Sequence, residues 1–149
     1  MTDFELIKMA LEAREKAYTP YSHHKVGAAL LSKDGVVYKG CNIENAGYTP
    51  TNCAERTAVF KAVSEDEREF IKIAIVGGMD HLKNLPLCAP CGVCRQVLRE
   101  FVSPETFKVI LAECDGVDDL ASLDESRVRM RTFALDELLP LGFGPENLA

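Results

Sequence analysis

The spacing of apolar residues along the chain changes between a helical period and a strand period, which predicts a mixed α/β fold. Residues 2–18 carry apolar side chains near helical spacing, and Thr2 with Glu5 three positions later is typical of a capping box. Further helices are predicted at residues 53–63 and 90–102, with a helical turn at 135–139. The predicted strands are residues 26–31, 36–41, 71–76, 107–112 and 128–133. Residues 115–127 fit no element.

The order of these elements indicates how the sheet is built. Residues 33–35, Lys-Asp-Gly, separate the first two predicted strands and are typical of a hairpin turn. Residues 71–76 are mostly apolar, so we expect this strand to be covered on both faces, and we expect Gly77 and Gly78 to end it. Strands that alternate with helices predict a mixed sheet with helices on both faces.

Length and charge narrow the classes of ligand. The chain has 149 residues, which is the size of a single domain, residues 1–149. Its net charge of −6 would repel phosphate backbones, so a nucleic acid is disfavoured as the main ligand and a neutral or weakly charged small molecule is favoured. No apolar run reaches the length of a membrane span, and the acidic first residues do not resemble an export signal. We therefore expect no membrane partner and a cytoplasmic location.

The cysteine pattern indicates a metal site. Three of the six cysteines lie within residues 88–94, and Cys91 and Cys94 fall on one face at a predicted helix start. Helix N-termini favour thiolates, and zinc is the natural ion for such a pair. Two sulfurs do not complete a site, and Cys53, which opens another predicted helix, is the best candidate for a third ligand. The isolated Cys41 and Cys114 are expected to be core residues.

A zinc ion with three protein ligands keeps its fourth position for water, which is the pattern of catalytic sites. Glu55 lies two residues after Cys53 and is well placed to transfer protons. Zinc with three thiolates has a net charge of −1, so we expect the helix N-termini and Arg56 to offset the negative charge at the sulfurs. A stripe of small residues follows on the same predicted helix, and it would suit either close packing of two helices or a helix lying flat on the sheet; its members are Ala54, Ala58 and Ala62.

The two cysteine segments match the signature of zinc-dependent deaminases, in which a ligand, one residue and Glu are followed later by Pro-Cys-x-x-Cys. Here the segments are residues 53–55, Cys-Ala-Glu, and residues 90–94, Pro-Cys-Gly-Val-Cys. Further blocks at residues 20–22, 26–30, 40–46, 94–96 and 137–140 occur in the same order as in one family. The chain therefore resembles the small homotetrameric cytidine deaminases.

This resemblance implies a three-layer α-β-α sandwich around a five-stranded mixed sheet. It implies hydrolysis of cytidine and 2′-deoxycytidine to uridine and 2′-deoxyuridine with release of ammonia, by zinc-activated water with Glu55 as proton shuttle, in pyrimidine salvage. The implied ligands of one zinc ion per chain are Cys53, Cys91 and Cys94. Asn42 and Glu44 resemble the residues that bind the ribose hydroxyls.

The resemblance also implies contacts to the base and a shared active site in a homotetramer. The backbone around Ala46 and Ala54 matches segments that read the base, and Tyr48 resembles a pocket residue near a subunit boundary. Phe143 matches an aromatic residue that stacks on the base from a neighbouring subunit, although it could also pack in its own core. His24 stands where the family usually has Phe, and it could stack in the pocket or face solvent. Residues 77–87 form a longer segment than is usual, which we interpret as a surface insertion.

Three other interpretations remain open. A structural zinc module would take a fourth sulfur from Cys88 or Cys41 and hold no water. A polynucleotide-directed or antibiotic-directed deaminase could use the same zinc core, although the acidic charge disfavours nucleic acid. A redox pair formed by Cys91 and Cys94 would leave Cys53 and Glu55 without a role.

Overall fold

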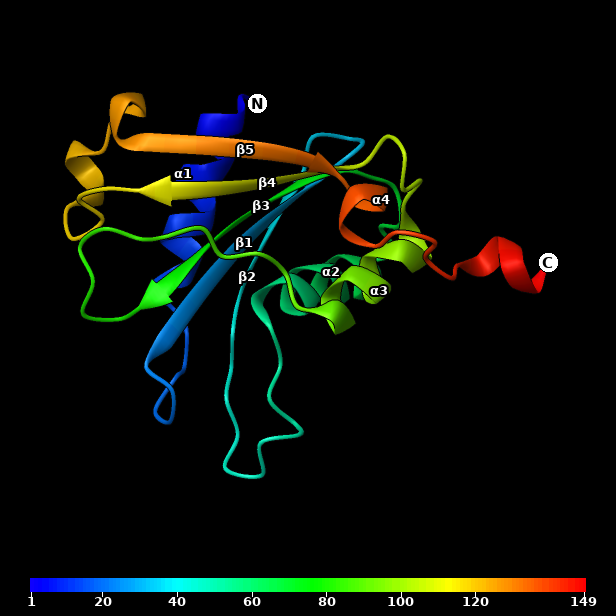
Figure 1. Ribbon diagram of the computed structural model, residues 1–149, viewed down its shortest axis with the longest axis horizontal. Helices are drawn as coiled ribbons and strands as arrows, with labels where there is room; N and C mark the ends of the chain where they lie inside the picture. Colours follow the sequence, from blue (N-terminus) through cyan, green and yellow to red (C-terminus); the bar gives the residue numbers. More distant parts are fainter.

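The structure is a computed structural model that describes residues 1–149, and its helices lie on both sides of one sheet (Figure 1). The helices are α1 (Asp3–Arg14), α2 (Ala54–Ser64), α3 (Gly92–Phe101) and the single turn α4 (Leu135–Leu138). The strands are β1 (His24–Ser32), β2 (Val37–Cys41), β3 (Phe70–Met79), β4 (Lys108–Cys114) and β5 (Val128–Ala134). None of the helices combines the length and the apolarity that crossing a bilayer requires.

The five strands run in the order β2-β1-β3-β4-β5. The β3–β4 pair is parallel and the other three pairs are antiparallel, so the sheet is mixed, as predicted. Helix α1 covers one face, while α2 and α3 cover the other. A separate apolar core fills each interface between helices and sheet, and the expected three-layer sandwich is confirmed.

The structure corrects the predicted end of β3. Gly77 and Gly78 do not end the strand, because they pair with Val26 and Lys25 of β1 and the strand continues to Met79. Their missing side chains leave room for Cys88 and Leu85, which come from the segment after the strand. Leu85 is buried, so the segment predicted to be a surface insertion contributes partly to the core.

The segment that fitted no element folds as two short 3-10 turns, Leu120–Ser122 and Glu125–Arg127. Leu120 and Leu123 pack against the core on the α1 side of the sheet. These scattered contacts have no fixed period, which explains why the sequence pattern did not reveal them.

Two glycines let the flanking helices approach the sheet closely. A Cβ atom on Gly27 would lie 2.0 Å from the carbonyl oxygen of Ala10 in α1. On the opposite face, a Cβ atom on Gly40 would lie 2.4 Å from the carbonyl oxygen of Ala54 and 2.5 Å from the backbone nitrogen of Ala58. The small-residue stripe of α2 therefore faces the sheet, and the helix lies flat on β2 with its N-terminus beside the end of that strand.

We predict that Gly40→Ala destabilises the protein by about 1–3 kcal/mol, because the added methyl group meets the backbone of α2 rather than a flexible side chain. Gly92→Ala is the matched control, because nothing lies within 4 Å of the corresponding position. Urea unfolding of both variants measures the difference. Equal midpoints for the two variants would contradict the close approach of α2.

Candidate metal centre and active site

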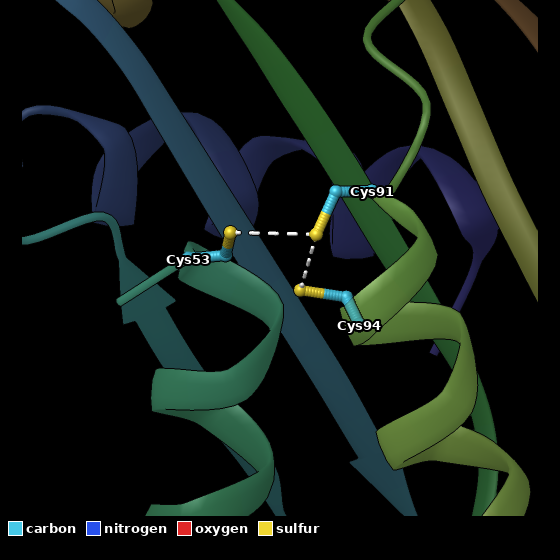
Figure 2. A group of neighbouring side chains, drawn as sticks. All are labelled: Cys53, Cys91 and Cys94. Carbon is cyan, nitrogen blue, oxygen red and sulfur yellow. Dashed lines mark hydrogen bonds between the residues drawn. The ribbon is translucent and has the colours of Figure 1, made fainter. Parts of the chain in front are cut away.

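Three cysteine sulfurs converge where α2 and α3 begin (Figure 2). Cys53 is the N-cap residue of α2 and Cys91 is the N-cap residue of α3, while Cys94 lies in the first turn of α3. The Sγ atoms of Cys53 and Cys91 are 3.7 Å apart, and those of Cys91 and Cys94 are 3.5 Å apart. All three sulfurs lie within 4.8 Å of one another.

These distances fit one tetrahedral zinc ion. Zinc–sulfur bonds of about 2.3 Å place the sulfurs of a tetrahedral site about 3.8 Å apart, whereas a disulfide requires about 2.05 Å. No further His, Cys, Asp or Glu joins the group of three. Cys41 lines a different cavity beside α1, and Cys88 lies outside the group. The donor set is therefore that of a three-ligand zinc site, and the closed structural module lacks a fourth sulfur.

The surroundings of the sulfurs favour thiolates. Neither Cys53 nor Cys91 accepts a hydrogen bond from its own helix through its side chain, so the backbone N–H groups of both first turns remain free beside the sulfurs. Hydrogen bonding with the Cys94 thiol, followed by that from Arg56, lowers the pKa of Cys53 to about 5. Interaction with Cys53, followed by burial, raises the pKa of Cys94.

Arg56 lies directly against the sulfur group. Its Nη2 atom donates to Cys53 Sγ at 3.2 Å, and this hydrogen bond is the main cause of a raised guanidinium pKa. Its Nε atom is buried and has no hydrogen-bond acceptor. A positive side chain that donates a hydrogen bond to a cysteine sulfur fits a site with excess negative charge.

Glu55 is buried beside this centre but is not part of the sulfur group. Its side chain is only 3% exposed. Burial, followed by repulsion from the Cys53 thiolate, raises the pKa of Glu55 to about 7. The N-cap and the first turn of α2 thus bring one sulfur of the group and a carboxyl group with a raised pKa within two residues of each other.

A cavity of about 270 Å³ leads from this centre to the surface. It brings together seven of the predicted site residues, namely His24, Asn42, Glu44, Cys53, Ala54, Glu55 and Cys91. Cys53, Ala54 and Glu55 come from α2, while Asn42 and Glu44 lie in the loop that extends beyond the sheet after β2 (Figure 1). His24 therefore faces the cavity and is not confined to the solvent side.

The two polar residues at the far end of the cavity are held by β1 and the segment before it. Asn42 Oδ1 accepts from the backbone N–H of Val26 at 2.9 Å, and its Nδ2 donates to the carbonyl oxygen of His24 at 2.8 Å. Glu44 accepts from the backbone N–H groups of Tyr21 and Ser22 and from the Ser22 hydroxyl. The hydroxyl bond is the main cause of a lowered Glu44 pKa, so this carboxylate stays ionised.

Three of the predicted substrate-binding residues do not line this cavity within one chain. Ala46 is exposed, and Tyr48, which is 74% exposed, borders a neighbouring depression where its ring meets that of Tyr21 edge-on. Phe143 is 56% exposed on the C-terminal segment, so it is not packed in its own core. Gln96 of α3 donates to the carbonyl oxygen of Phe143 at 2.8 Å and holds this segment against the helix.

Sequence reasoning missed five other residues that line the cavity, namely Ser22, Val26, Thr51, Asn52 and Ala89. It also considered Cys88 only as a fourth metal ligand, whereas the structure places it on the cavity wall. Its position three residues before Cys91 could have suggested proximity to the site but not its role.

Comparison with known proteins places this centre in a family. Residues 1–110 match the family model described as the cytidine and deoxycytidylate deaminase zinc-binding region. The chain belongs to this family.

Relatives in this deaminase family match nearly the whole chain. The cytidine deaminase of Halalkalibacterium halodurans is 47% identical over 143 residues, which cover 96% of this chain and 95% of that protein. The cytidine deaminase of Sporosarcina psychrophila is 44% identical over 145 residues, which cover 97% of this chain and 93% of that protein. A crystal structure of cytidine deaminase from Burkholderia pseudomallei is 45% identical, covers 96% of this chain and 100% of its own, and superposes with a TM-score of 0.78.

We predict that Arg56→Ala weakens zinc retention and lowers turnover, because the Cys53 sulfur loses its charged hydrogen-bond donor. Loss of such a partner typically costs about 10–100-fold in metal affinity or activity. Dialysis against a chelator followed by metal analysis measures retention. Arg68→Ala, which removes an exposed arginine far from the sulfurs, is the control. Unchanged zinc content and turnover in Arg56→Ala would exclude this role.

Proposed function

We propose that the protein hydrolyses cytidine and 2′-deoxycytidine to uridine and 2′-deoxyuridine and releases ammonia, as a step of pyrimidine salvage. The observation that carries this proposal is the buried Glu55 beside a three-sulfur zinc site, at the inner end of a cavity that a nucleoside can enter. The cytidine deaminases that cover the whole chain support the choice of substrate.

In this proposal Cys53, Cys91 and Cys94 hold one zinc ion, which when bound lowers the pKa of a water molecule and so supplies a nucleophile at neutral pH. Glu55 takes a proton from the water and delivers it to the ring nitrogen next to the amine-bearing carbon. The carbon–oxygen bond forms, and Glu55 then carries the remaining proton of the new hydroxyl group to the amine. The carbon–nitrogen bond breaks as the carbonyl forms, and the amine leaves as ammonia. Because Glu55 is buried, its proton passes to the substrate rather than to bulk water.

The outer part of the cavity is suited to the ribose. The Glu44 carboxylate can accept hydrogen bonds from hydroxyl groups, and the Asn42 amide keeps one N–H and one lone pair beyond its two bonds to β1. An ionised carboxylate repels a phosphate group, and the chain carries a net charge of −6. A nucleoside is therefore favoured over a nucleotide or a nucleic acid.

The remaining contacts are to the base. In this proposal the backbone at Ala54 and Ala46 reads the edge of the pyrimidine, and Tyr48 closes the pocket at a subunit boundary. His24 stacks against the ring from β1, since it lies on the cavity wall beside Val26. An imidazole has a smaller face than the phenyl ring usual at this position, so the wall it offers to the base is narrower.

We further propose a homotetramer with shared active sites in the cytoplasm. Support comes from Phe143, an exposed aromatic residue that its own chain holds away from its own cavity. In the assembly this ring covers the base in the site of a neighbouring copy. A reducing compartment is consistent with six free cysteines, three of which must stay reduced to bind metal.

We predict that Glu55→Gln lowers ammonia release from cytidine by about 10²–10⁴-fold, because the amide cannot transfer protons. Zinc content should remain one per chain, since Glu55 is not a ligand. Glu65→Gln, which changes an exposed carboxylate at the other end of α2, is the control. An active Glu55→Gln variant would contradict the mechanism, and a wild-type protein with bound zinc but no cytidine turnover would contradict the proposed function.

If each active site combines residues from two chains, two variants that are impaired in different residues should restore each other's activity when they assemble together. Phe143→Ala should raise the KM for cytidine, because the base loses an aromatic partner, while Glu55→Gln is inactive. When the two chains are produced together, some sites combine Glu55 from one chain with Phe143 from the other. The turnover of the mixed protein at low cytidine concentration should therefore exceed the average turnover of the two variants measured separately. Turnover equal to that average would show that each site is complete within one chain.

A further inference from the structure

Cys88 is a thiol on the cavity wall to which the proposed mechanism gives no task. It is not a member of the sulfur group that would hold zinc. A Cβ atom on Gly77 of β3 would lie 2.8 Å from Cys88 Sγ and 3.0 Å from Cγ2 of Val26. The thiol therefore fills the space that a side chain at position 77 would occupy, and it is held firmly between β3 and the cavity.

The proposed reaction determines which edge of the pyrimidine lies near this thiol, so the inference rests on the proposed function. The amine-bearing carbon 4 must lie beside the sulfurs, and Glu55 must reach the ring nitrogen 3 on one side of it. Helix α2 supplies Cys53, Ala54 and Glu55 on that side of the cavity. The segment before α3 supplies Cys88, Ala89 and Cys91, and Cys91 lies across the sulfur group from Cys53 (Figure 2). Carbon 5, the other ring neighbour of carbon 4, is consequently turned toward this second wall.

We propose that Cys88 determines specificity by limiting the size of the group that the substrate can carry at carbon 5 of the pyrimidine. A hydrogen atom leaves the ring free to approach the sulfurs and Glu55. A methyl group or a larger substituent meets the Cys88 thiol, which cannot retreat because the backbone of Gly77 lies behind it with no room for even a Cβ atom between them.

The chemistry of the thiol suits an apolar wall. Burial is the main cause that raises the pKa of Cys88 to about 11, so the side chain is a neutral group of moderate size at neutral pH. It neither competes with Glu55 for protons nor presents a charge to the base. Its effect on a substrate is therefore steric, and it depends on volume rather than on reactivity.

The test compares kcat/KM for 5-methylcytidine with kcat/KM for cytidine across variants that change this volume. Cys88→Ala should raise the ratio about tenfold, the usual scale for one methyl group in a pocket. Cys88→Leu should lower it. Gly77→Ala keeps the thiol but presses it into the cavity, and should also lower the ratio. Cys88→Ser, which is close to cysteine in size, should leave the ratio within about twofold of wild type.

Cys41→Ala is the matched control, because this half-buried thiol lines a different cavity and should leave the ratio unchanged. Metal analysis should find one zinc per chain in every variant. An unchanged ratio in Cys88→Ala would overturn the inference, and loss of zinc from Cys88→Ser would instead show Cys88 to be a ligand. If Cys88→Leu or Gly77→Ala fails to fold, Cys88→Ala and Cys88→Ser decide the outcome. A wild-type protein that does not deaminate cytidine would overturn the proposed function itself, a result distinct from an active enzyme with an unchanged ratio.

Discussion

The meeting of two helix N-termini at three sulfurs is the constraint on which the rest of the structure depends. Cys53 and Cys91 both occupy N-cap positions, and Cys94 lies in the following turn of α3. Sulfurs 3.5 and 3.7 Å apart repel one another when ionised, and only free backbone N–H groups, Arg56 and a metal ion offset that repulsion. Helix α2 must therefore lie close to the sheet to bring its N-terminus to that point, and the absence of a side chain at Gly40 allows it.

The fold was predictable in its elements and less so in its details. Apolar periodicity located all five strands, and Thr2 with Glu5 formed the predicted capping box. The extension of β3 through Gly77 and Gly78 was not predictable, because consecutive glycines usually indicate the end of a strand. Here the two glycines instead leave room for the side chains of Cys88 and Leu85. That contact depends on how the segment after β3 folds back over the strand, which the spacing of apolar residues does not specify.

Some residues of the candidate site could be predicted from the sequence, and others could not. The cysteine spacing indicated the sulfur group before any coordinates, because residues three apart at a helix start share one face. The contribution of Cys53 was found only because it also opens a helix beside a carboxylate. The wall formed by Cys88 and Val26 was missed, since an apolar residue at a cavity looks the same in sequence as one in a core.

Helix α3 positions two of the sulfurs, and its side chains also bind the C-terminal segment of the chain. Arg95 donates to the carbonyl oxygen of Leu138, and Arg99 pairs with Glu146, while a Cβ atom on Gly144 would collide with the Arg99 guanidinium. The C-terminal segment is therefore held by side chains of α3, whose first turn also contains Cys94. A shift of α3 would consequently move the Cys94 sulfur and the segment that carries Phe143 together. Under the proposed sharing of sites, the aromatic contact to a neighbouring base is then set by the metal centre of the chain that provides it.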